Sequence, residues 1–378
     1  MTRTLEILEK LVAFPTVSHT SNLEMVGWVE DLLHKAGFTV TRIPAVTQEK
    51  SGLFAQKGPD APGGVCLSGH MDVVPVEGQI WNRPAFQVTK DATRIFGRGT
   101  TDMKGFVASA LALAERADTA DLQKPLSLCL SYDEEVGCVG IRHMMPTVKT
   151  LIGQPKVVVV GEPTSMHTAI GHKGKAALHV TCRGQAGHSA LAPRFVNAIH
   201  LAADFVTEIR MLQTRLANEI LDNAYDIPYS TVHVGKISGG QALNMIPDEV
   251  MLEMEFRHLA QAIPDKIRAQ IRDAGHRIGQ KYDLPDAILI EQTNAYPGLG
   301  IDADNPAVGW AAKMTENPST TKVAFGTEAG FFAELGLNAV VVGPGDMSAD
   351  GHKPDEGIAV SQLVACDQMM TRILQDLC

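Results

Sequence analysis

The sequence predicts an α/β protein whose larger domain has a mainly parallel sheet covered by helices, with a smaller α+β domain inserted into it. Strand and helix patterns alternate through roughly the first 160 residues, which is typical of a parallel sheet with helical crossovers. The order then becomes β-α-β-β-α-β, as in a ferredoxin-like unit. The length of 378 residues also exceeds what one hydrophobic core usually supports, so two domains are expected.

The first part of the chain supplies most elements of the larger domain. Apolar spacing predicts helices over 5–13 and 23–36, and a glycine- and threonine-rich loop over 97–105 is expected to open a third helix over 106–116. Strands buried on both faces of a parallel sheet read as continuous apolar runs. Such runs predict strands over 65–68, 126–132 and 157–160. A strand is also expected over 38–43, and a further helix near 138–145.

The pattern changes after about residue 173. Apolar and polar residues alternate over 176–184, as in a half-exposed strand, and a long helix is predicted over 197–219. Further strands are expected over 230–237, 249–257 and 287–292, with a helix over 265–281. The tail returns to the first style, with helices over 305–316, 330–335 and 361–377 and a strand over 339–342. The larger domain is therefore predicted to be discontinuous, with residues 1–174 and 293–378 enclosing an inserted domain over 175–292.

The composition narrows the range of partners. It is 45% apolar and 20% charged with a net charge of −10, which is ordinary for a globular protein. No basic run resembles a nucleic-acid arm and no apolar stretch could span a membrane, so neither partner is expected. The six cysteines form no CxxC pair and three lie in apolar runs, which favours free thiols in a reducing compartment. Because the N-terminal residues show no secretory signal, we expect a cytoplasmic location.

Candidate metal ligands lie at strand ends and at loop-to-helix junctions. In an open α/β sheet, ligands bind outside the carboxyl ends of the strands. A set of two imidazoles and three carboxylates suits divalent zinc, cobalt or manganese. Five ligands exceed what one catalytic zinc needs, and they fit two metals that share a bridging carboxylate. The five residues are His70, Asp102, Glu135, Glu162 and His352.

Two further acids fit this hypothesis. Asp72 follows His70 closely enough to hold its ring, and Glu134 adjoins a proposed ligand, where a general base is required. Taken singly, these residues have simpler interpretations: Asp102 as a helix N-cap, Glu134 and Glu135 as acids in a first helical turn, and His352 as a loop residue. The simpler interpretations weaken together, because the residues all fall at one edge of the same predicted sheet.

Two features lie in the inserted domain. His188 is flanked by small residues, which would let it approach a substrate, although a surface loop histidine is an equally good interpretation. The glycine-rich turn over 238–240 with the downstream Asn244 matches no phosphate-binding pattern and reads as a turn beside a pocket. A dehydrogenase is excluded because no GxGxxG follows the first strand.

Five stretches together resemble the dinuclear zinc aminoacylase and peptidase family, which includes acetylornithine deacetylase, succinyl-diaminopimelate desuccinylase and glutamate carboxypeptidase. The resemblance covers nearly the whole chain, and its motifs occur in the family order. The stretches are SGHMDVVP over 68–75, GRGTTDMKG over 97–105, DEEVG over 133–137, GEPT over 161–164 and GHKPDE over 351–356.

The resemblance implies a role for each residue. It assigns His70 and Glu162 to one zinc ion, Glu135 and His352 to a second, and Asp102 to both; cobalt is a possible substitute for zinc. Glu134 would act as general base and acid, and Asp72 would orient His70. His188 would reach the active site of a partner subunit, in a homodimer formed through an inserted dimerisation and lid domain. Some members of the family carry a cis peptide after the bridging aspartate, which is Asp102–Met103 in this chain.

Within the family, the stretches 161–174, 184–189 and 325–329 are most similar to acetylornithine deacetylases. This implies hydrolysis of an N-acyl amino acid, most closely N2-acetyl-L-ornithine, in arginine biosynthesis. A desuccinylase, a dipeptidase and a ligand-binding relative without activity remain alternatives. The candidates for substrate binding are Lys173, Asn244, Arg257, Thr327 and Glu328, with Asp346 as a second acid that could meet a side-chain ammonium.

Overall fold

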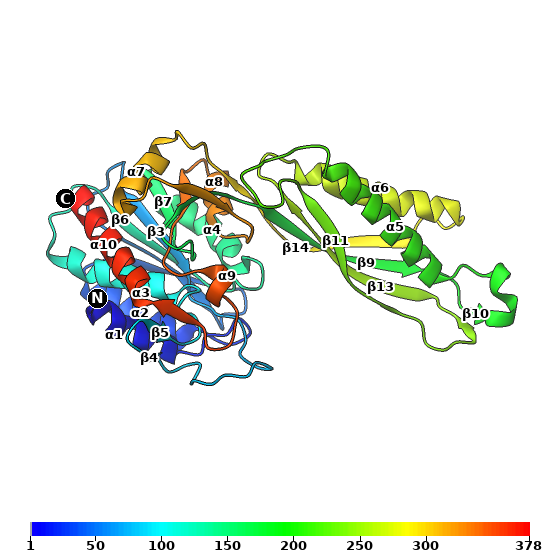
Figure 1. Cartoon of the computed structure of the whole chain (residues 1–378), viewed down its shortest axis with the longest axis horizontal. Helices are drawn as coiled ribbons and strands as arrows, with labels where there is room; N and C mark the ends of the chain where they lie inside the picture. Colours follow the sequence, from blue (N-terminus) through cyan, green and yellow to red (C-terminus); the bar gives the residue numbers. More distant parts are fainter. Residues whose placement is uncertain (1) are drawn as a thin grey trace. The chain divides into compact units, whose positions relative to one another are not determined.

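The structure is a computed structural model that describes residues 2–378. The chain forms two compact units (Figure 1). The first runs to Gly171 and also contains Leu299–Val323 and Thr327–Cys378; the second comprises His172–Gly298 and Ala324–Gly326. The chain therefore leaves the first unit, builds the second, and returns.

The first unit is built on a nine-stranded sheet with the order β1-β2-β6-β3-β7-β17-β8-β15, in which β16 also pairs with β8. Its four central strands, β6, β3, β7 and β17, are parallel to one another, whereas β1, β2 and β8 pair antiparallel. The strands are β1 (Thr39–Pro44), β2 (Ser51–Lys57), β3 (Val65–His70), β6 (Leu126–Ser131), β7 (Val157–Val160), β8 (Thr168–His172), β15 (Leu299–Gly300), β16 (Thr320–Val323) and β17 (Ala339–Val341).

Every residue of β3, β6 and β7 is buried, so these strands are apolar apart from small serine and glycine residues and His70 at the end of β3. A small three-stranded sheet, β18-β5-β4, lies beside them in the chain's first unit. It consists of β4 (Thr89–Lys90), β5 (Arg94–Phe96) and β18 (Gly357–Ala359).

Helices cover both faces of the large sheet. One core cluster joins side chains of α1, α2, α3, α7 and α10 to sheet residues such as Leu53 and Leu67. Gly52, the neighbour of Leu53, faces the opposite side of the sheet, where Met144 of α4 packs against it. The helices are α1 (Thr2–Ala13), α2 (Leu23–Lys35), α3 (Lys104–Arg116), α4 (Val139–Leu151), α7 (Pro306–Thr315), α8 (Ala329–Glu334), α9 (Met347–Asp350) and α10 (Val360–Leu377), with the short 3₁₀ turn η1 (Ala117–Thr119).

The helix predicted near 138–145 is longer than expected. It continues through Pro146 to Leu151. Its buried side chains Met144, Met145 and Val148 lie on both sides of the proline, so packing of this face outweighs the backbone hydrogen bond that proline cannot donate.

The second unit has the predicted β-α-β-β-α-β order, with a short β10–β12 pair added at one end (Figure 1). Its antiparallel sheet has the order β11-β13-β9-β14, and the residues of β9 alternate between buried and more exposed positions. The buried face packs on α5 and α6 in a separate core. The elements are β9 (Gly174–Arg183), β10 (Gly187–His188), η2 (Ser189–Arg194), α5 (Ala198–Leu216), β11 (Thr231–Gly239), β12 (Met245–Ile246), β13 (Glu249–His258), α6 (Pro264–Lys281) and β14 (Ile288–Tyr296).

All six cysteines lie within the described range and are free, and five of them are buried. Across residues 2–378 the helices are all too short or too polar to cross a membrane.

Candidate metal centre

The centre forms where neighbouring strands of the first unit end. β3 ends at His70, and it pairs in parallel with both β6 and β7. Glu134 and Glu135 therefore follow β6, and Glu162 follows β7, at the same edge of the sheet. Asp102 reaches this edge from the loop that precedes α3. The strand order thus gathers acids that are far apart in sequence.

One group of potential ligands consists of His70, Asp102 and Glu162, all of which are buried. The His70 Nε2 atom lies 3.1 Å from Asp102 Oδ1 and 3.8 Å from Glu162 Oε1. One ligand atom from each residue lies within 4.8 Å of the others. This spacing leaves the three atoms able to surround one cation.

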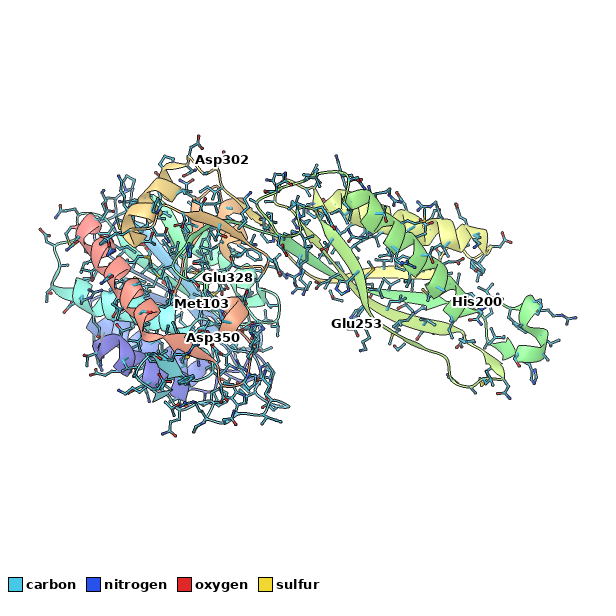
Figure 2. The ribbon with its side chains drawn as sticks, viewed as in Figure 1. Met103, His200, Glu253, Asp302, Glu328 and Asp350 are labelled. Carbon is cyan, nitrogen blue, oxygen red and sulfur yellow. The ribbon has the colours of Figure 1, made fainter. Side chains whose placement is uncertain are left out.

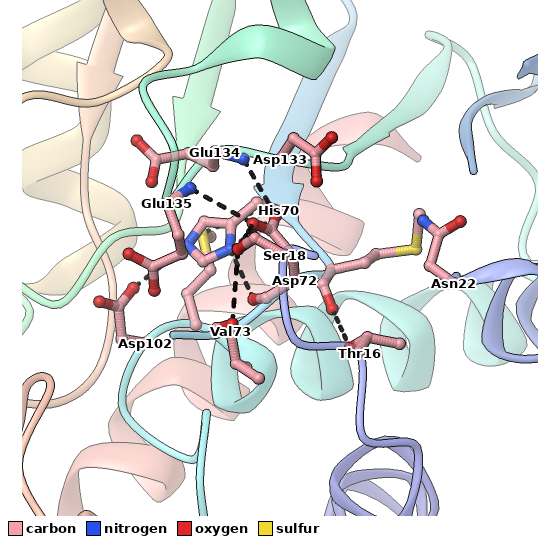
Figure 3. A network of polar contacts seen from close by, with 12 residues as sticks. Thr16, Ser18, Asn22, His70, Asp72, Val73, Asp102, Asp133, Glu134 and Glu135 are labelled. Carbon is pink, nitrogen blue, oxygen red and sulfur yellow. Dashed lines mark hydrogen bonds and ion pairs between the residues drawn. The ribbon is translucent and has the colours of Figure 1, made fainter. Parts of the chain in front are cut away.

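The second group consists of Asp102, Glu135 and His352. The His352 Nε2 atom lies 3.1 Å from Asp102 Oδ2 and 3.0 Å from Glu135 Oε2. In Figure 3 the side chains of Glu135 and Asp102 point toward one another. Asp102 therefore offers one carboxylate oxygen to each group, and the peptide bond that follows it, Asp102–Met103, is cis.

The chemistry of these donors fits a pair of divalent cations. Burial and the neighbouring Asp102 carboxylate raise the pKa of Glu135 to about 8, and the same two causes raise the pKa of Glu162 well above its usual range. Glu135 Oε1 is buried without a hydrogen-bond partner in the described part of the chain. Buried carboxylates are stable when they are paired or coordinate a metal, and divalent charge would offset their mutual repulsion.

Asp72 links His70 to the strand end that carries the two glutamates. Its backbone carbonyl lies 3.0 Å from His70 Nδ1, whereas its carboxylate lies 3.6 Å from that nitrogen. The carboxylate instead accepts the backbone N–H groups of Glu134 at 3.1 Å and Glu135 at 3.3 Å, and the Ser18 hydroxyl at 2.7 Å (Figure 3). Asp72 therefore contacts His70 chiefly through its main chain and uses its carboxylate to position residues 134–135.

Glu134 is not a member of either ligand group. Its Oε1 accepts a hydrogen bond from the Cys138 thiol at 3.2 Å. Burial raises the pKa of Glu134 to about 7, a change that His70 opposes and that the charges of Glu328 and Asp102 reinforce. A carboxylate with a pKa near neutrality, held beside candidate metal ligands, is suited to accept and donate a proton.

Thr327 and Glu328 lie at the start of α8 in the first unit (Glu328 is labelled in Figure 2). The Thr327 hydroxyl accepts the backbone N–H of Ala329, the first residue of this helix, at 3.1 Å. Glu328 is only 1% exposed, and neither of its carboxylate oxygens has a hydrogen-bond partner within residues 2–378. Burial raises the pKa of Glu328 to about 7, a change that the nearby Ser131 hydroxyl and His70 oppose. Asp346 caps α9 by accepting the backbone N–H groups of Ser348 and Ala349.

The other predicted residues belong to the second unit. His188 and Asn244 are exposed and adjoin one another across the β10–β12 pair, where the Ser189 N–H donates to the Asn244 carbonyl at 3.1 Å. Lys173 donates to the carbonyls of Ile227 and Tyr229 at 2.8 and 2.6 Å.

Arg257 pairs with Glu255 at 3.0 Å and donates to the Tyr296 hydroxyl at 3.3 Å. Burial and then the charge of Arg257 lower the pKa of Lys173. Two cationic side chains therefore lie close together in this unit.

Several residues around the centre had no predicted role. Ser18 contacts Asp72, and a buried ion pair between Arg98 and Glu356 supports the loop that carries Asp102. Glu356 lies inside the stretch 351–356, but only its long-range contacts reveal what it holds. No spacing in the sequence links it to Gly99 or Asp102.

Comparisons with known proteins agree with this geometry. Residues 66–376 match the model of "Peptidase family M20/M25/M40". Over 377 residues the chain is 33% identical to an acetylornithine deacetylase of Myxococcus xanthus, covering 98% of this chain and 96% of the relative.

Solved structures share the fold at lower identity. An M20 family metallo-carboxypeptidase of Sulfolobus solfataricus superposes with a TM-score of 0.80 at 17% identity, covering 99% of each chain. YXEP of Bacillus subtilis, described as a dinuclear metal-binding peptidase from the M20 family, has a TM-score of 0.70 at 15% identity, covering 100% of this chain and 98% of its own.

The fold class predicted from the sequence is confirmed by this likeness. The family model, the curated relative and the two ligand groups that share one aspartate lead to the same conclusion. The chain belongs to peptidase family M20/M25/M40 and is a metal-dependent amidohydrolase.

Proposed function

We propose that the protein hydrolyses N2-acetyl-L-ornithine to L-ornithine and acetate. The main support for hydrolysis is the pair of potential ligand groups joined by Asp102, with Glu134 beside them. The preference for acetyl-ornithine is supported by 33% identity to the acetylornithine deacetylase of Myxococcus xanthus over almost the whole chain.

We assign His70 and Glu162 to one metal ion, Glu135 and His352 to the other, and Asp102 to both. Zinc is the proposed metal, because mixed imidazole and carboxylate ligands suit it, and cobalt is the proposed substitute. When bound, the two cations supply Lewis acidity and increase the acidity of a water molecule.

The chain's own residues account for the movement of protons. Glu134 takes a proton from the attacking water, whose oxygen then bonds to the acyl carbon. The same carboxyl passes that proton to the nitrogen of the amide as the C–N bond breaks, which releases a carboxylate and an amine. Burial raises the pKa of Glu134 above its ordinary value, which favours proton uptake by this carboxylate.

We assign His188 a role in a homodimer, where the histidine of one subunit stabilises the developing oxyanion in the site of its partner. Two features support this assignment. The imidazole is exposed, and its Nδ1 is occupied by the Ala190 N–H, which leaves Nε2 as the nitrogen that can donate. Exposed apolar side chains surround the same end of the second unit, namely Leu191, Ile199, Leu243 and Met245.

For the substrate we assign Lys173 and Arg257 to the α-carboxylate, with Asn244 supplied, like His188, by the partner subunit, because Asn244 and Lys173 lie near opposite ends of β9 within one chain. Thr327 is assigned to the positioning of Glu328. Glu328 is the candidate for the side-chain ammonium, because a buried carboxylate without a partner in the described chain favours a cation. We also propose a cytoplasmic location, consistent with six free cysteines, and a place in arginine biosynthesis.

A substrate panel tests the proposal. The purified protein is assayed with N2-acetyl-L-ornithine, N-succinyl-diaminopimelate, N-acetyl-methionine and a dipeptide, before chelation, after chelation, and with zinc or cobalt restored. We expect the highest kcat/KM for acetyl-ornithine, equal yields of ornithine and acetate, and loss of turnover on chelation. Faster turnover of the succinyl substrate or the dipeptide would overturn the substrate assignment. Metal-loaded protein without any turnover would favour a ligand-binding relative.

A further inference from the structure

Glu356 is a buried carboxylate that holds the loop leading to Asp102. It is 1% exposed. Its Oε1 accepts the backbone N–H groups of Thr101 at 2.9 Å and Asp102 at 3.1 Å. Its Oε2 accepts the backbone N–H of Gly99 at 2.9 Å and Arg98 Nη1 at 2.8 Å. Four donors from five consecutive residues therefore converge on one side chain.

These contacts fix the main chain at the shared ligand. A carboxylate that accepts several N–H groups and a guanidinium is held by charge-assisted hydrogen bonds, which are shorter and stronger than neutral ones. Because the Asp102 N–H is one of the donors, the backbone that carries the bridging carboxylate cannot shift without breaking a bond to a buried charge.

The same network reaches His352. Arg98 Nη2 donates to Gln79 Oε1 at 2.6 Å, and the Trp81 indole donates to that oxygen at 3.1 Å. The Gln79 amide donates in turn to the His352 carbonyl at 2.8 Å. His352 has a φ of +60°, a left-handed conformation that needs support in a residue other than glycine.

We propose that Glu356, with Arg98 and Gln79, is a positioning network that sets the second metal group by holding Asp102 and His352 together. The inference rests on the proposed assignment of these two residues as metal ligands. None of the three network residues needs to touch metal or substrate. Their function is to keep two ligands, 250 residues apart in the chain, at one separation.

Metal titration of the full-length protein tests the network without reference to any substrate. Zinc is removed and then titrated back into wild type, Glu356→Gln and Glu356→Asp, with calorimetry and elemental analysis as readouts. The amide introduced by Glu356→Gln keeps one acceptor oxygen but replaces the other with a donor, so two of the four contacts are lost. We expect one equivalent of zinc to bind about 10- to 100-fold more weakly, the range for outer ligand supports, with partial recovery in Glu356→Asp.

Asp367→Asn is the matched control. Asp367 is a part-buried carboxylate of the same unit that accepts hydrogen bonds from Thr4 and Ser109. Loss of the Asp367 carboxylate should lower the midpoint temperature of unfolding while leaving the affinities for both zinc equivalents unchanged. Two equivalents bound by Glu356→Gln with wild-type affinity would overturn the proposal.

Gln79→Ala tests the positioning network independently if Glu356→Gln does not fold. It removes the donor to His352 and the acceptor of Arg98 while leaving the buried ion pair in place. We expect a weaker second equivalent here too, and unchanged zinc binding would overturn the proposal. Because zinc binding is measured directly, failure of the acetyl-ornithine assignment would not produce either result.

Discussion

The Asp72 carboxylate accepts the backbone N–H of Glu134 at 3.1 Å, across 62 residues of sequence. One residue thus links the end of β3, which carries His70, to the segment after β6, which carries Glu134 and Glu135. The position of the proposed base relative to the proposed ligands depends on this contact.

We predict that Asp72→Asn lowers kcat by about 10- to 100-fold, because the amide is a weaker acceptor and presents a donor to one of the N–H groups. Steady-state kinetics on metal-loaded protein measures this effect. Ser18→Ala removes one hydrogen-bond donor to the Asp72 carboxylate and should lower kcat much less than Asp72→Asn does. A kcat for Asp72→Asn equal to that of wild type would show that the carboxylate does not position the 134–135 segment.

Glu134→Gln should retain both metal ions but lose about 10²- to 10⁴-fold in kcat, the usual contribution of a general base. Glu135→Gln should instead lose metal, since Glu135 belongs to a ligand group. Metal content and kcat of the two variants are measured side by side. Activity within about threefold of wild type in Glu134→Gln would remove its assignment as the base.

The same variant tests the partner histidine. Glu134→Gln and His188→Ala are each expected to be nearly inactive. Mixing them under conditions that exchange subunits should restore part of the rate, because one site of each hybrid dimer has an intact Glu134 and receives an intact His188. Mixtures that stay inactive, although exchange is verified, would contradict the role of the partner subunit.

Glu328→Gln should reduce kcat/KM for N2-acetyl-L-ornithine by about 10- to 100-fold, the effect of losing a hydrogen bond to a charged group. N-acetyl-methionine has no side-chain charge, so its kcat/KM should hardly change. Glu334→Gln, at the exposed end of α8, serves as the control. An equal loss on both substrates would mean that Glu328 does not recognise charge.

His172 makes stability depend on pH. Burial lowers its pKa from 6.5 to about 4, and its Nε2 has no hydrogen-bond partner in the region the structure describes. The folded state favours the neutral His172 ring, whereas the unfolded state binds a proton below pH 6.5. The contribution of His172 to the free energy of unfolding is therefore fully present above pH 6.5 and is lost as pH falls toward 4. A shift of this size corresponds to about 3 kcal/mol.

Urea unfolding of metal-free wild type and His172→Asn between about pH 7 and pH 4 measures this contribution. The asparagine amide can still donate to the Lys173 carbonyl, which His172 Nδ1 contacts at 3.1 Å. We expect wild type to lose stability relative to the variant below pH 6.5, whereas the exposed-site variant His276→Asn should follow wild type. Parallel curves for wild type and His172→Asn would rule out this linkage.

The fold could be predicted where burial leaves a clear pattern. β7 is an unbroken apolar run, and β3 and β6 are largely apolar with small serine or glycine residues between, because both faces of these strands are covered. β9 alternates because one face is open. The strand β2 (Ser51–Lys57) is absent from the predicted elements, since its glycine and lysine weaken the apolar pattern. Its burial comes from pairing with β1 and β6, which a local pattern does not reveal.

The candidate site likewise contains residues that the sequence indicates and residues that only tertiary contacts reveal. Candidate metal ligands at strand ends, such as His70 and Glu162, could be selected from the sequence because residue type and strand position coincide, and the structure brings both into one potential ligand group. Glu356 and Gln79 could not, because their roles depend on contacts with residues 98–102 and 352. The sequence predicts that the Asp72 carboxylate holds His70, and its contacts with the N–H groups of residues 134–135 follow only from the tertiary fold.

Elemental analysis of metal per chain shows whether two metal ions share Asp102. Wild type should hold two zinc equivalents after gel filtration, and Asp102→Asn should hold fewer than one, because both groups lose a charged ligand. Two tightly held equivalents in Asp102→Asn, or full turnover by wild type with one equivalent or none, would rule out a two-metal centre built on Asp102.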